Sequence, residues 1–358
     1  LGEKKMPQYQ VFDAEDRIVE TTKVTTGYFS DGGGVLDGSA MITSSITGSQ
    51  KKYYHNIREN GSTNDEFSIT FGSKTGAGSG DVTSHTKAIY QYFADLLLFP
   101  DEVETLGFQF LSGSTENTIF VIAAERARMK DRWNRKNWTL NLGATLGAPF
   151  DALTGYASSS NLYLTDDSDT VAPSPTPVGP RYNVVSGALG VKVGSTGFYA
   201  DNHPYGYFYP NMGVIVLNGT ALSASLPGAH PTSGSVEEDR PQGIGFAVDT
   251  NTTAKNHLKL YNALVSGSLQ ARSEEDQITT SYFVRARAAH FNFSNNPTFY
   301  SGSDATFSIT EFTGNPQTFI TTVGLHDAQG TMVAVGRLST PVLKNFSTEF
   351  TAKVNLVH

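Results

Sequence analysis

The segment that most clearly indicates the fold class of this 358-residue chain is QTFITTVGLHDAQGTMVAVGRLSTPVLKNFSTEFTAKVNLV, residues 317–357. It contains two short apolar and β-branched runs, QTFITTVGL and TMVAVGRL, separated by the turn sequence DAQG. Such runs, bounded by polar turn residues, predict strands. In the third run, TEFTAKVNLV, apolar and polar residues alternate strictly: Phe350, Ala352, Val354 and Leu356 against Thr351, Lys353 and Asn355. The segment therefore predicts a C-terminal antiparallel meander with one face in water.

Strand patterns also dominate the rest of the chain. EFSITFGS places Phe67, Ile69 and Phe71 on one face, which is typical of a half-buried strand. The apolar run TIFVIAA, residues 118–124, predicts a strand buried on both faces. RYNVVSGAL, residues 181–189, and GVIVLNG, residues 213–219, indicate further strands.

Two segments have the apolar spacing of an amphipathic helix. SHTKAIYQYFADLLLFP, residues 84–100, carries Ser84 as the expected N-cap and ends at Pro100. AKNHLKLYNALV, residues 254–265, is the second, with Thr253 as its expected cap. The chain is therefore expected to be α+β and β-dominated, with antiparallel, sandwich-like sheets and two or a few short helices.

Composition divides the chain into four expected parts. Residues 1–50 are rich in Thr, Ser and Gly and read as an extended N-terminal arm, followed by a mixed α/β domain over 51–163. Residues 164–180, LTDDSDTVAPSPTPVGP, combine acids with four prolines and read as a linker or surface loop. A β-rich C-terminal domain is expected over 181–358.

The cysteine content, the net charge and the length of the apolar runs restrict the classes of function that the chain can have. The chain has no cysteine, which excludes disulfides, thiolate metal sites and cysteine nucleophiles. Its net charge is −8, whereas a protein that wraps nucleic acid normally presents a broad basic face. The longest apolar runs, such as YFADLLLF, are shorter than a membrane span needs, and the first residues lack the apolar core of a signal peptide. Neither secretion nor membrane insertion is indicated.

A search for catalytic or metal-binding motifs yields nothing strong. GSKTGAGSG, residues 72–80, lacks the adjacent Gly-Lys-Ser/Thr of a phosphate loop, and no G-x-S-x-G occurs. The eight histidines do not stand at the spacings that ligate a metal from one element, and Asp201 with His203 is only a weak local cluster. Acid pairs such as Asp166 and Asp167 are expected in solvated loops. No catalytic residue, cofactor or metal is predicted.

One basic stretch stands out, ERARMKDRWNRKNW, residues 125–138, in a chain that is otherwise acidic. Arginine pairs with carboxylates as well as with phosphates, so an acidic protein partner or internal salt bridges are favoured over nucleic acid or a plain solvated loop. The candidate interface residues are Arg126, Arg128, Lys130, Arg132, Trp133, Arg135 and Lys136.

Two aromatic segments form the second candidate interface: FYADNHPYGYFYPNMG, residues 198–213, and HFNFSNNPTFY, residues 290–300. Aromatic rings on loops suit protein interfaces, because they supply contact area at low entropic cost. A core role and a ligand-stacking role remain alternatives. The candidate residues are Tyr205, Tyr207, Phe208, Tyr209, Phe291 and Phe293.

Several long segments carry a resemblance to a known family. YFVRARAAHFNFSNNPTFY, residues 282–300, and the segment from 315 to 358 resemble the C-terminal part of virion structural proteins of large T-even-like contractile-tailed bacteriophages, marine and cyanophage types included. The resemblance reaches back through YNVVSGAL, YFYPNMGVIVLNG, SLQARSEE, FSITFGSKTGAGSG, TKAIYQYFADLLL and RARMKDRWNRKNWTLNL. It covers most of the chain from about residue 20.

The resemblance implies a non-enzymatic virion protein of the tail, with the baseplate as the expected location. Its partners would be other tail and baseplate proteins, fibres and further copies of itself, without membrane or nucleic acid. It would be assembled in the host cytoplasm. No functional residue is carried over from the family. A receptor- or glycan-binding tail protein, a neck or head–tail connector, and a DNA contact through the basic stretch remain the alternatives.

Overall fold

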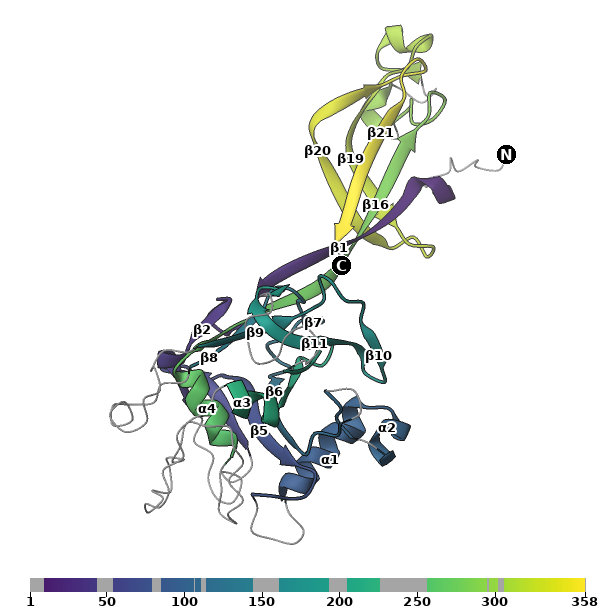
Figure 1. The fold of residues 1–358 in the computed structure, drawn as a ribbon. Coiled ribbons are helices and arrows are strands. Elements are labelled where there is room, and N and C mark those ends of the chain that lie inside the picture. The colour runs from purple at the N-terminus through teal and green to yellow at the C-terminus, as the bar shows by residue number, and fades with distance from the viewer. Residues whose placement is uncertain are drawn as a thin grey trace. The chain divides into compact units, whose positions relative to one another are not determined.

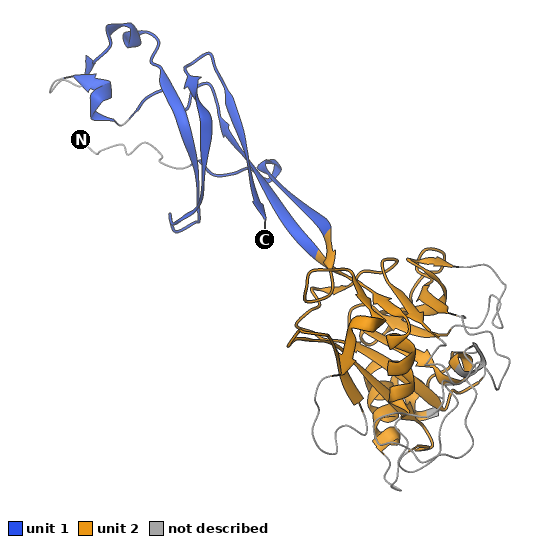
Figure 2. Ribbon diagram, turned by 90° about the vertical axis from the view of Figure 1, so that its left-hand side faces the viewer, with its two compact units in different colours: residues 1–23, 276–358 blue, residues 24–275 orange. Residues whose placement is uncertain are grey.

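The chain divides into two compact units (Figures 1 and 2). The computed structural model describes residues 10–43, 54–78, 85–105, 107–110, 114–143, 161–192, 205–225, 256–294, 296–301 and 306–357. Unit 1 comprises residues 1–23 and 276–358, and unit 2 comprises residues 24–275. The chain passes from one unit to the other twice, within strand β1 (Arg17–Gly27) and within strand β16 (Arg272–Ala286).

Unit 2 is built on one large antiparallel sheet. Its paired strands follow the order β2-β15-β8-β9-β11-β13-β14-β6-β5-β4-β3, with β10 and β12 attached to β11. The strands are β2 (Val35–Asp37), β3 (Met41–Thr43), β4 (Tyr54–Glu59), β5 (Asp65–Ser73), β6 (Thr118–Ala124), β8 (Thr139–Leu142), β9 (Leu162–Asp166), β10 (Ser174–Thr176), β11 (Gly179–Ala188), β12 (Val191–Lys192), β13 (Gly206–Tyr209), β14 (Val214–Asn218) and β15 (Ser268–Gln270).

The sheet curves round on itself. Its first strand β2 and its last strand β3 are joined by only three residues, the 3₁₀ turn η2 (Gly38–Ala40). Four residue steps span at most about 14 Å, so the two ends of the sheet lie close together. Four short helices accompany it: α1 (His85–Leu97), α2 (Pro100–Thr105), α3 (Gly219–Ser225) and α4 (His257–Val265).

Apolar side chains pack on both faces of this sheet. On β6, Phe120 and Ile122 belong to the larger core cluster, to which α3 and α4 also contribute. Ile119 and Val121 of the same strand belong to the second cluster, together with residues of α1. Alternate side chains of a strand point to opposite faces, so the continuous run TIFVIAA is apolar because both of its faces are covered.

Unit 1 is a smaller arrangement of long strands. Residues 279–286 of β16 pair antiparallel with β21 (Phe350–Val357). A separate hairpin consists of β19 (Thr318–His326) and β20 (Met332–Lys344). The remaining elements are η1 (Ala14–Asp16), η4 (Pro297–Phe299), β17 (Tyr300–Ser301), β18 (Thr306–Phe307) and η5 (Thr310–Thr313). The first part of β16 lies in unit 2, where Ser273 and Glu274 pair with β7 (Arg132–Trp133).

The predicted α+β, β-dominated fold class is confirmed: strands prevail, the pairings are antiparallel and the helices are short. The C-terminal meander is corrected in one respect. β19 and β20 pair as expected, but the third strand, β21, pairs with β16, which lies much earlier in the sequence. The alternation within β21 is confirmed, because residues 350, 352, 354 and 356 are partly covered while their neighbours are exposed.

The expected division of the chain also requires correction. Residues 164–180 are not a linker between domains, because they contribute to β9, β10 and β11 of the large sheet. The alternative of a surface loop agrees with residues 169–173, which are exposed between β9 and β10. Residues 1–50 are not simply an arm, since β2 and β3 are the two ends of that sheet. Composition alone misplaced both boundaries: Pro and Gly mark the turns of a sheet as readily as they mark a linker. The expected caps Ser84 and Thr253 lie outside the described residues.

Candidate functional site: an apolar interaction surface

The basic stretch 125–138 is held within unit 2 by ion pairs. The Nε of Arg132 donates to the Oε1 of Glu274 at 2.8 Å, and the side-chain amide of Asn134 donates to the Oε2 of the same carboxylate at 2.6 Å. The ammonium of Lys130 lies 3.0 Å from the carboxylate of Glu275. Two consecutive acids of β16 thus hold the middle of the stretch.

The end of the stretch is held by other parts of unit 2. The Arg135 guanidinium donates to the Tyr182 hydroxyl at 2.7 Å. The Lys136 ammonium donates to Asp169 at 2.6 Å, and its backbone amide donates to Asp166 at 2.9 Å. Arg126 donates to the backbone oxygen of Asp131 at 3.4 Å. These contacts match the interpretation of the stretch as a site of internal salt bridges.

Trp133 is buried, which corrects its assignment as an interface residue. Both tryptophans of the chain, Trp133 and Trp138, are inaccessible to solvent and contact the ring of Phe208, with centroid distances of 6.2 and 5.0 Å. Arg128 is partly exposed, whereas Arg126, Lys130 and Arg135 are exposed. The stretch therefore has a basic outer side and an aromatic inner side.

The aromatic residues at 205–209 are also core residues, not an interface. Phe208 belongs to the larger cluster, while Tyr207 and Tyr209 point to the opposite face and belong to the second one. Arg181 lies over the ring of Tyr207 at 4.2 Å, and burial raises the pKa of the Tyr209 hydroxyl. Tyr205 is buried in the larger cluster. The surface assignment failed because β13 is covered on both sides.

The acid pair Asp166 and Asp167 is buried as well, which corrects its expected place in a solvated loop. The Asp167 carboxylate accepts the backbone amide of Asn183 at 3.0 Å and its side-chain amide at 2.7 Å. Burial raises the pKa of the Asp167 carboxyl above its ordinary value of 3.8, and the bonds from Asn183 act in the opposite direction. Asp201 and His203 lie outside the described residues.

The remaining candidates, Phe291 and Phe293, are exposed in unit 1. They border a group of aromatic rings in which Phe293 stacks on Phe307 at 6.1 Å and Phe299 meets Phe312 at 5.5 Å. Phe346 contacts Phe293 edge-on at 6.1 Å. Sequence analysis thus placed these two residues correctly at the surface.

The β19–β20 hairpin has two different faces. On the inner face, Val323 and Leu325 are buried, and Gly336, opposite Val323, would carry a Cβ 3.9 Å from the side chain of Val354 on β21. The outer face carries exposed apolar residues. We call Phe319, Val333, Val335 and Leu343 the hairpin outer face; Leu343 lies opposite Phe319, and Val335 lies opposite Gly324.

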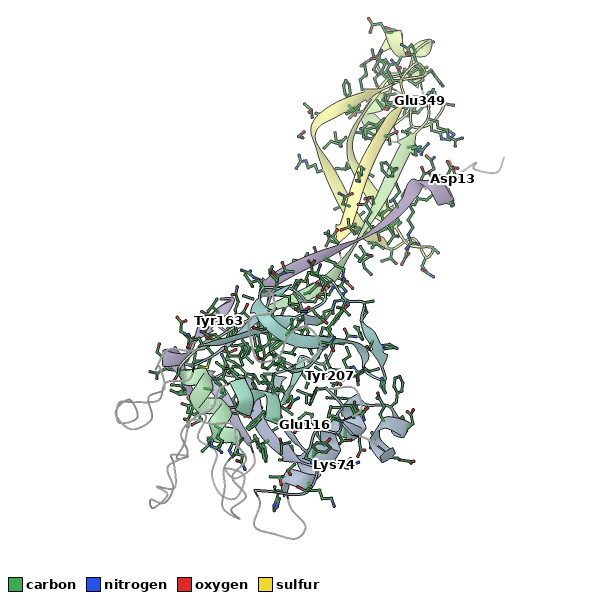
Figure 3. The ribbon with its side chains drawn as sticks, in the orientation of Figure 1. Asp13, Lys74, Glu116, Tyr163, Tyr207 and Glu349 are labelled. Carbon is green, nitrogen blue, oxygen red and sulfur yellow. The ribbon has the colours of Figure 1, made fainter. Side chains whose placement is uncertain are left out.

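The two units differ in how many of their apolar residues are buried and how many are exposed. Within the described residues, 46 apolar residues are buried, and only Ala286, Val323 and Leu325 of these lie in unit 1. Conversely, 14 of the 22 exposed large apolar residues lie in unit 1. Figure 3 shows the side chains of both units. Unit 1 therefore presents apolar surface instead of burying it, which sequence alternation alone did not reveal.

Unit 1 contains a buried charged residue, Lys344. Lys344, at the end of β20, is inaccessible to solvent, and its ammonium donates to the backbone oxygens of Ala288 and Asn345 and to the side-chain oxygen of Asn292, at 2.7–3.0 Å. Burial lowers the pKa of the Lys344 ammonium, and the negative charge of Glu349, labelled in Figure 3, acts in the opposite direction. One buried cation thus joins two loop segments, the one after β16 and the one after β20.

Within the described residues, no group of three or more His, Asp or Glu side chains could hold a metal ion. None of the helices in that part of the chain is long and apolar enough to cross a membrane. The chain matches no protein-family model, no curated protein and no solved structure. The site with the clearest physical character is therefore the apolar surface of unit 1.

Proposed function

We propose that this chain is a non-enzymatic structural subunit of a virion, a baseplate component of a contractile phage tail that links neighbouring subunits and fibres. The observation that carries the proposal is the surface of unit 1. In the described part of unit 1, 14 large apolar residues are exposed, and exposed apolar surface that gathers on one part of a protein is often covered in an assembly. The long sequence segments that resemble tail proteins supply the location.

In this role, the two units have different functions. Unit 2, with its two apolar clusters and its internally paired basic stretch, acts as a self-sufficient scaffold. Unit 1, in which three of the described apolar residues are buried, gains its stability from neighbouring proteins in the particle. The partners are other tail proteins, fibres and further copies of the chain, and the protein resides in the virion tail after assembly in the host cytoplasm.

Quantitative mass spectrometry of gradient-purified phage particles tests this function. The expected result is a constant molar ratio between this chain and the tail sheath subunit across the particle fractions. Cross-linking within the particle should join it to baseplate proteins; cross-links to neck proteins would assign it to the head–tail connector instead. Absence of the chain from the particles would reject the structural role.

A second candidate is receptor or glycan binding, and the exposed aromatic rings of unit 1 favour it specifically. Phe291 and Phe293 are exposed beside stacked rings, an arrangement that suits stacking on a sugar face. A glycan array with the wild type, Phe291→Ala and Phe293→Ala tests it. Binding that both substitutions abolish would support this function, and binding that neither affects would remove it.

A further inference from the structure

The chain contains two Asn-Gly pairs, and the structure places them in opposite settings. Asn60 and Gly61 form the turn between β4 and β5 and are both exposed. Asn218 is the last residue of β14, is 2% exposed, and precedes Gly219, the first residue of α3. The pair is chemically reactive because glycine has no side chain to shield its backbone nitrogen from the asparagine side chain before it. The same dipeptide therefore occurs once at the surface and once in the core.

The turn at Asn60 leaves the peptide bond between the two residues unrestrained. The Ser62 backbone amide donates to the Glu59 oxygen at 3.0 Å and closes a four-residue turn with Gly61 in third place. Gly61 has a φ of +88°, the left-handed conformation that this place of a type II turn requires. Within the described residues, the Gly61 amide donates no hydrogen bond, and a Cβ built on Gly61 would meet nothing within 4 Å. Rotation of this peptide can therefore bring the Gly61 nitrogen to the side chain of Asn60.

The buried pair has the opposite restraints. The Asn218 backbone amide donates to the Tyr205 oxygen at 2.7 Å, and the Asn218 side-chain oxygen accepts the Ala221 amide at 3.0 Å. The side-chain carbonyl is thus fixed at the start of α3. A Cβ on Gly219 would lie 2.5 Å from the hydroxyl oxygen of Thr118, so this glycine is tightly enclosed. The fold therefore holds the second pair in place and leaves the first one free to react.

We propose that Asn60 is a site of spontaneous deamidation and that the fold protects Asn218 from the same reaction. The amide proton of Gly61 passes to a base in solution, and the Gly61 nitrogen then attacks the side-chain carbonyl carbon Cγ of Asn60. The bond between Cγ and Nδ2 breaks, and Nδ2 leaves as ammonia with a proton taken from water. A succinimide ring remains. Water then opens the ring at either of its carbonyls and leaves an aspartate or an isoaspartate at position 60.

The reaction changes the turn in charge and in geometry. Both products add a negative charge beside Glu59, and isoaspartate also routes the main chain through the former side chain, which lengthens it. The Asn60 backbone amide donates to the Ala40 oxygen at 2.8 Å, which ties the turn to η2. Isoaspartate is expected to weaken this bond. Because deamidation needs neither a partner nor an enzyme, it is independent of the virion role proposed above.

Ageing of the purified full chain tests the proposal. The chain is incubated in mildly alkaline and in mildly acidic buffer, digested with pepsin at acidic pH, and analysed by liquid chromatography and mass spectrometry. In the native chain, the peptide with Asn60 is expected to gain the mass of an amide-to-acid conversion and to separate into aspartate and isoaspartate forms, faster in the alkaline buffer. The peptide with Asn218 should stay unchanged. In guanidinium chloride, where the fold is lost, both peptides should convert at similar rates.

Gly61→Ala supplies the matched variant, because a methyl group on this residue hinders ring closure without meeting any neighbour. Since alanine is strained at a φ of +88°, circular dichroism checks that the variant is folded. The conversion at Asn60 should become several-fold slower. Equal rates at Asn60 and Asn218 in the native chain would overturn the proposal. Conversion of Asn60 only in guanidinium chloride, or a rate that Gly61→Ala leaves unchanged, would overturn it as well.

Discussion

Asp167 is buried, and its carboxylate accepts hydrogen bonds from the backbone and side-chain amides of Asn183 in β11. Burial disfavours the charged form, so the pKa of the folded state lies above the ordinary value of 3.8. Between 3.8 and that raised pKa, the folded state binds more protons than the unfolded state. The free energy of unfolding therefore increases as the pH falls through this window.

Asp167→Asn removes this titration while keeping the size of the side chain. We expect the free energy of unfolding of the wild type, relative to that of the variant, to increase as the pH falls from neutral toward 3.8, because the folded wild type binds the extra proton. Urea unfolding followed by tryptophan fluorescence measures it, because both tryptophans lie in the core of unit 2. A difference that stays constant with pH, or changes in the opposite direction, would contradict the assignment.

A second buried charged group, the ammonium of Lys344, lies in unit 1. Lys344→Met keeps the length of the side chain but removes the donor to the side-chain oxygen of Asn292, whereas the backbone oxygens of Ala288 and Asn345 still accept from Asn292 and Thr348. A buried acceptor left unpaired costs about 1–3 kcal/mol, so we expect a loss of about that size in the stability of unit 1. Hydrogen exchange of residues 318–344 measures it. Lys353→Met, the same change at an exposed lysine of β21, should have little effect, and equal effects would count against the buried cation.

At the scale of elements, the stretch 125–138 is fixed by two neighbouring acids of β16 that differ in burial. Glu274 is buried and accepts from both Arg132 and Asn134, whereas Glu275 and Lys130 form a pair that is largely exposed. The two residues thus provide a matched comparison between a buried and an exposed ion pair within the same strand.

Glu274→Ala is expected to lower the free energy of unfolding of unit 2 by about 2 kcal/mol, because Arg132 and Asn134 lose a shared acceptor and Arg132 is itself partly solvated. Glu275→Ala should cost less than about 1 kcal/mol, as exposed pairs do. Denaturant unfolding followed by tryptophan fluorescence compares the two. Equal costs would show that the stretch is not anchored through Glu274.

Individual elements followed from the sequence where the pattern depended on their own residues. The run TIFVIAA predicted β6 to the residue, alternation predicted β5 and β21, and two apolar runs around the turn DAQG predicted β19 and β20. The burial of residues 205–209 could not be predicted from the sequence. GYFY, residues 206–209, is equally compatible with an exposed loop and with a strand covered on both faces. What decides between them is α1 on one side and the larger cluster on the other.

At the scale of the whole molecule, the two units differ in where their stability comes from. Unit 2 holds 43 of the 46 buried apolar residues in the described part of the chain. Folding is driven mainly by apolar burial, so we expect unit 2 to be the more stable part and unit 1 to gain stability from a partner that covers it. This is the physical basis for assigning assembly to unit 1.

Hydrogen exchange at several protein concentrations tests this division. The amides of β19 and β20 are expected to become more protected as the concentration rises, because association stabilises the bound state by mass action. The amides of β6 and β14 in the core of unit 2 should be protected equally at all concentrations. Protection of β19 and β20 that is independent of concentration would mean that unit 1 is stable without a partner.

The sequence by itself determined the antiparallel, β-dominated class and most individual strands, because alternation and apolar runs are properties of each segment. It also limited the chemistry, since the chain contains no cysteine. The tertiary structure decided which strands pair over long distances, such as β21 with β16 and the two ends of the large sheet at β2 and β3. It also decided which aromatic and acidic residues are buried. Burial depends on what covers a residue from elsewhere in the chain, and local sequence does not carry that information.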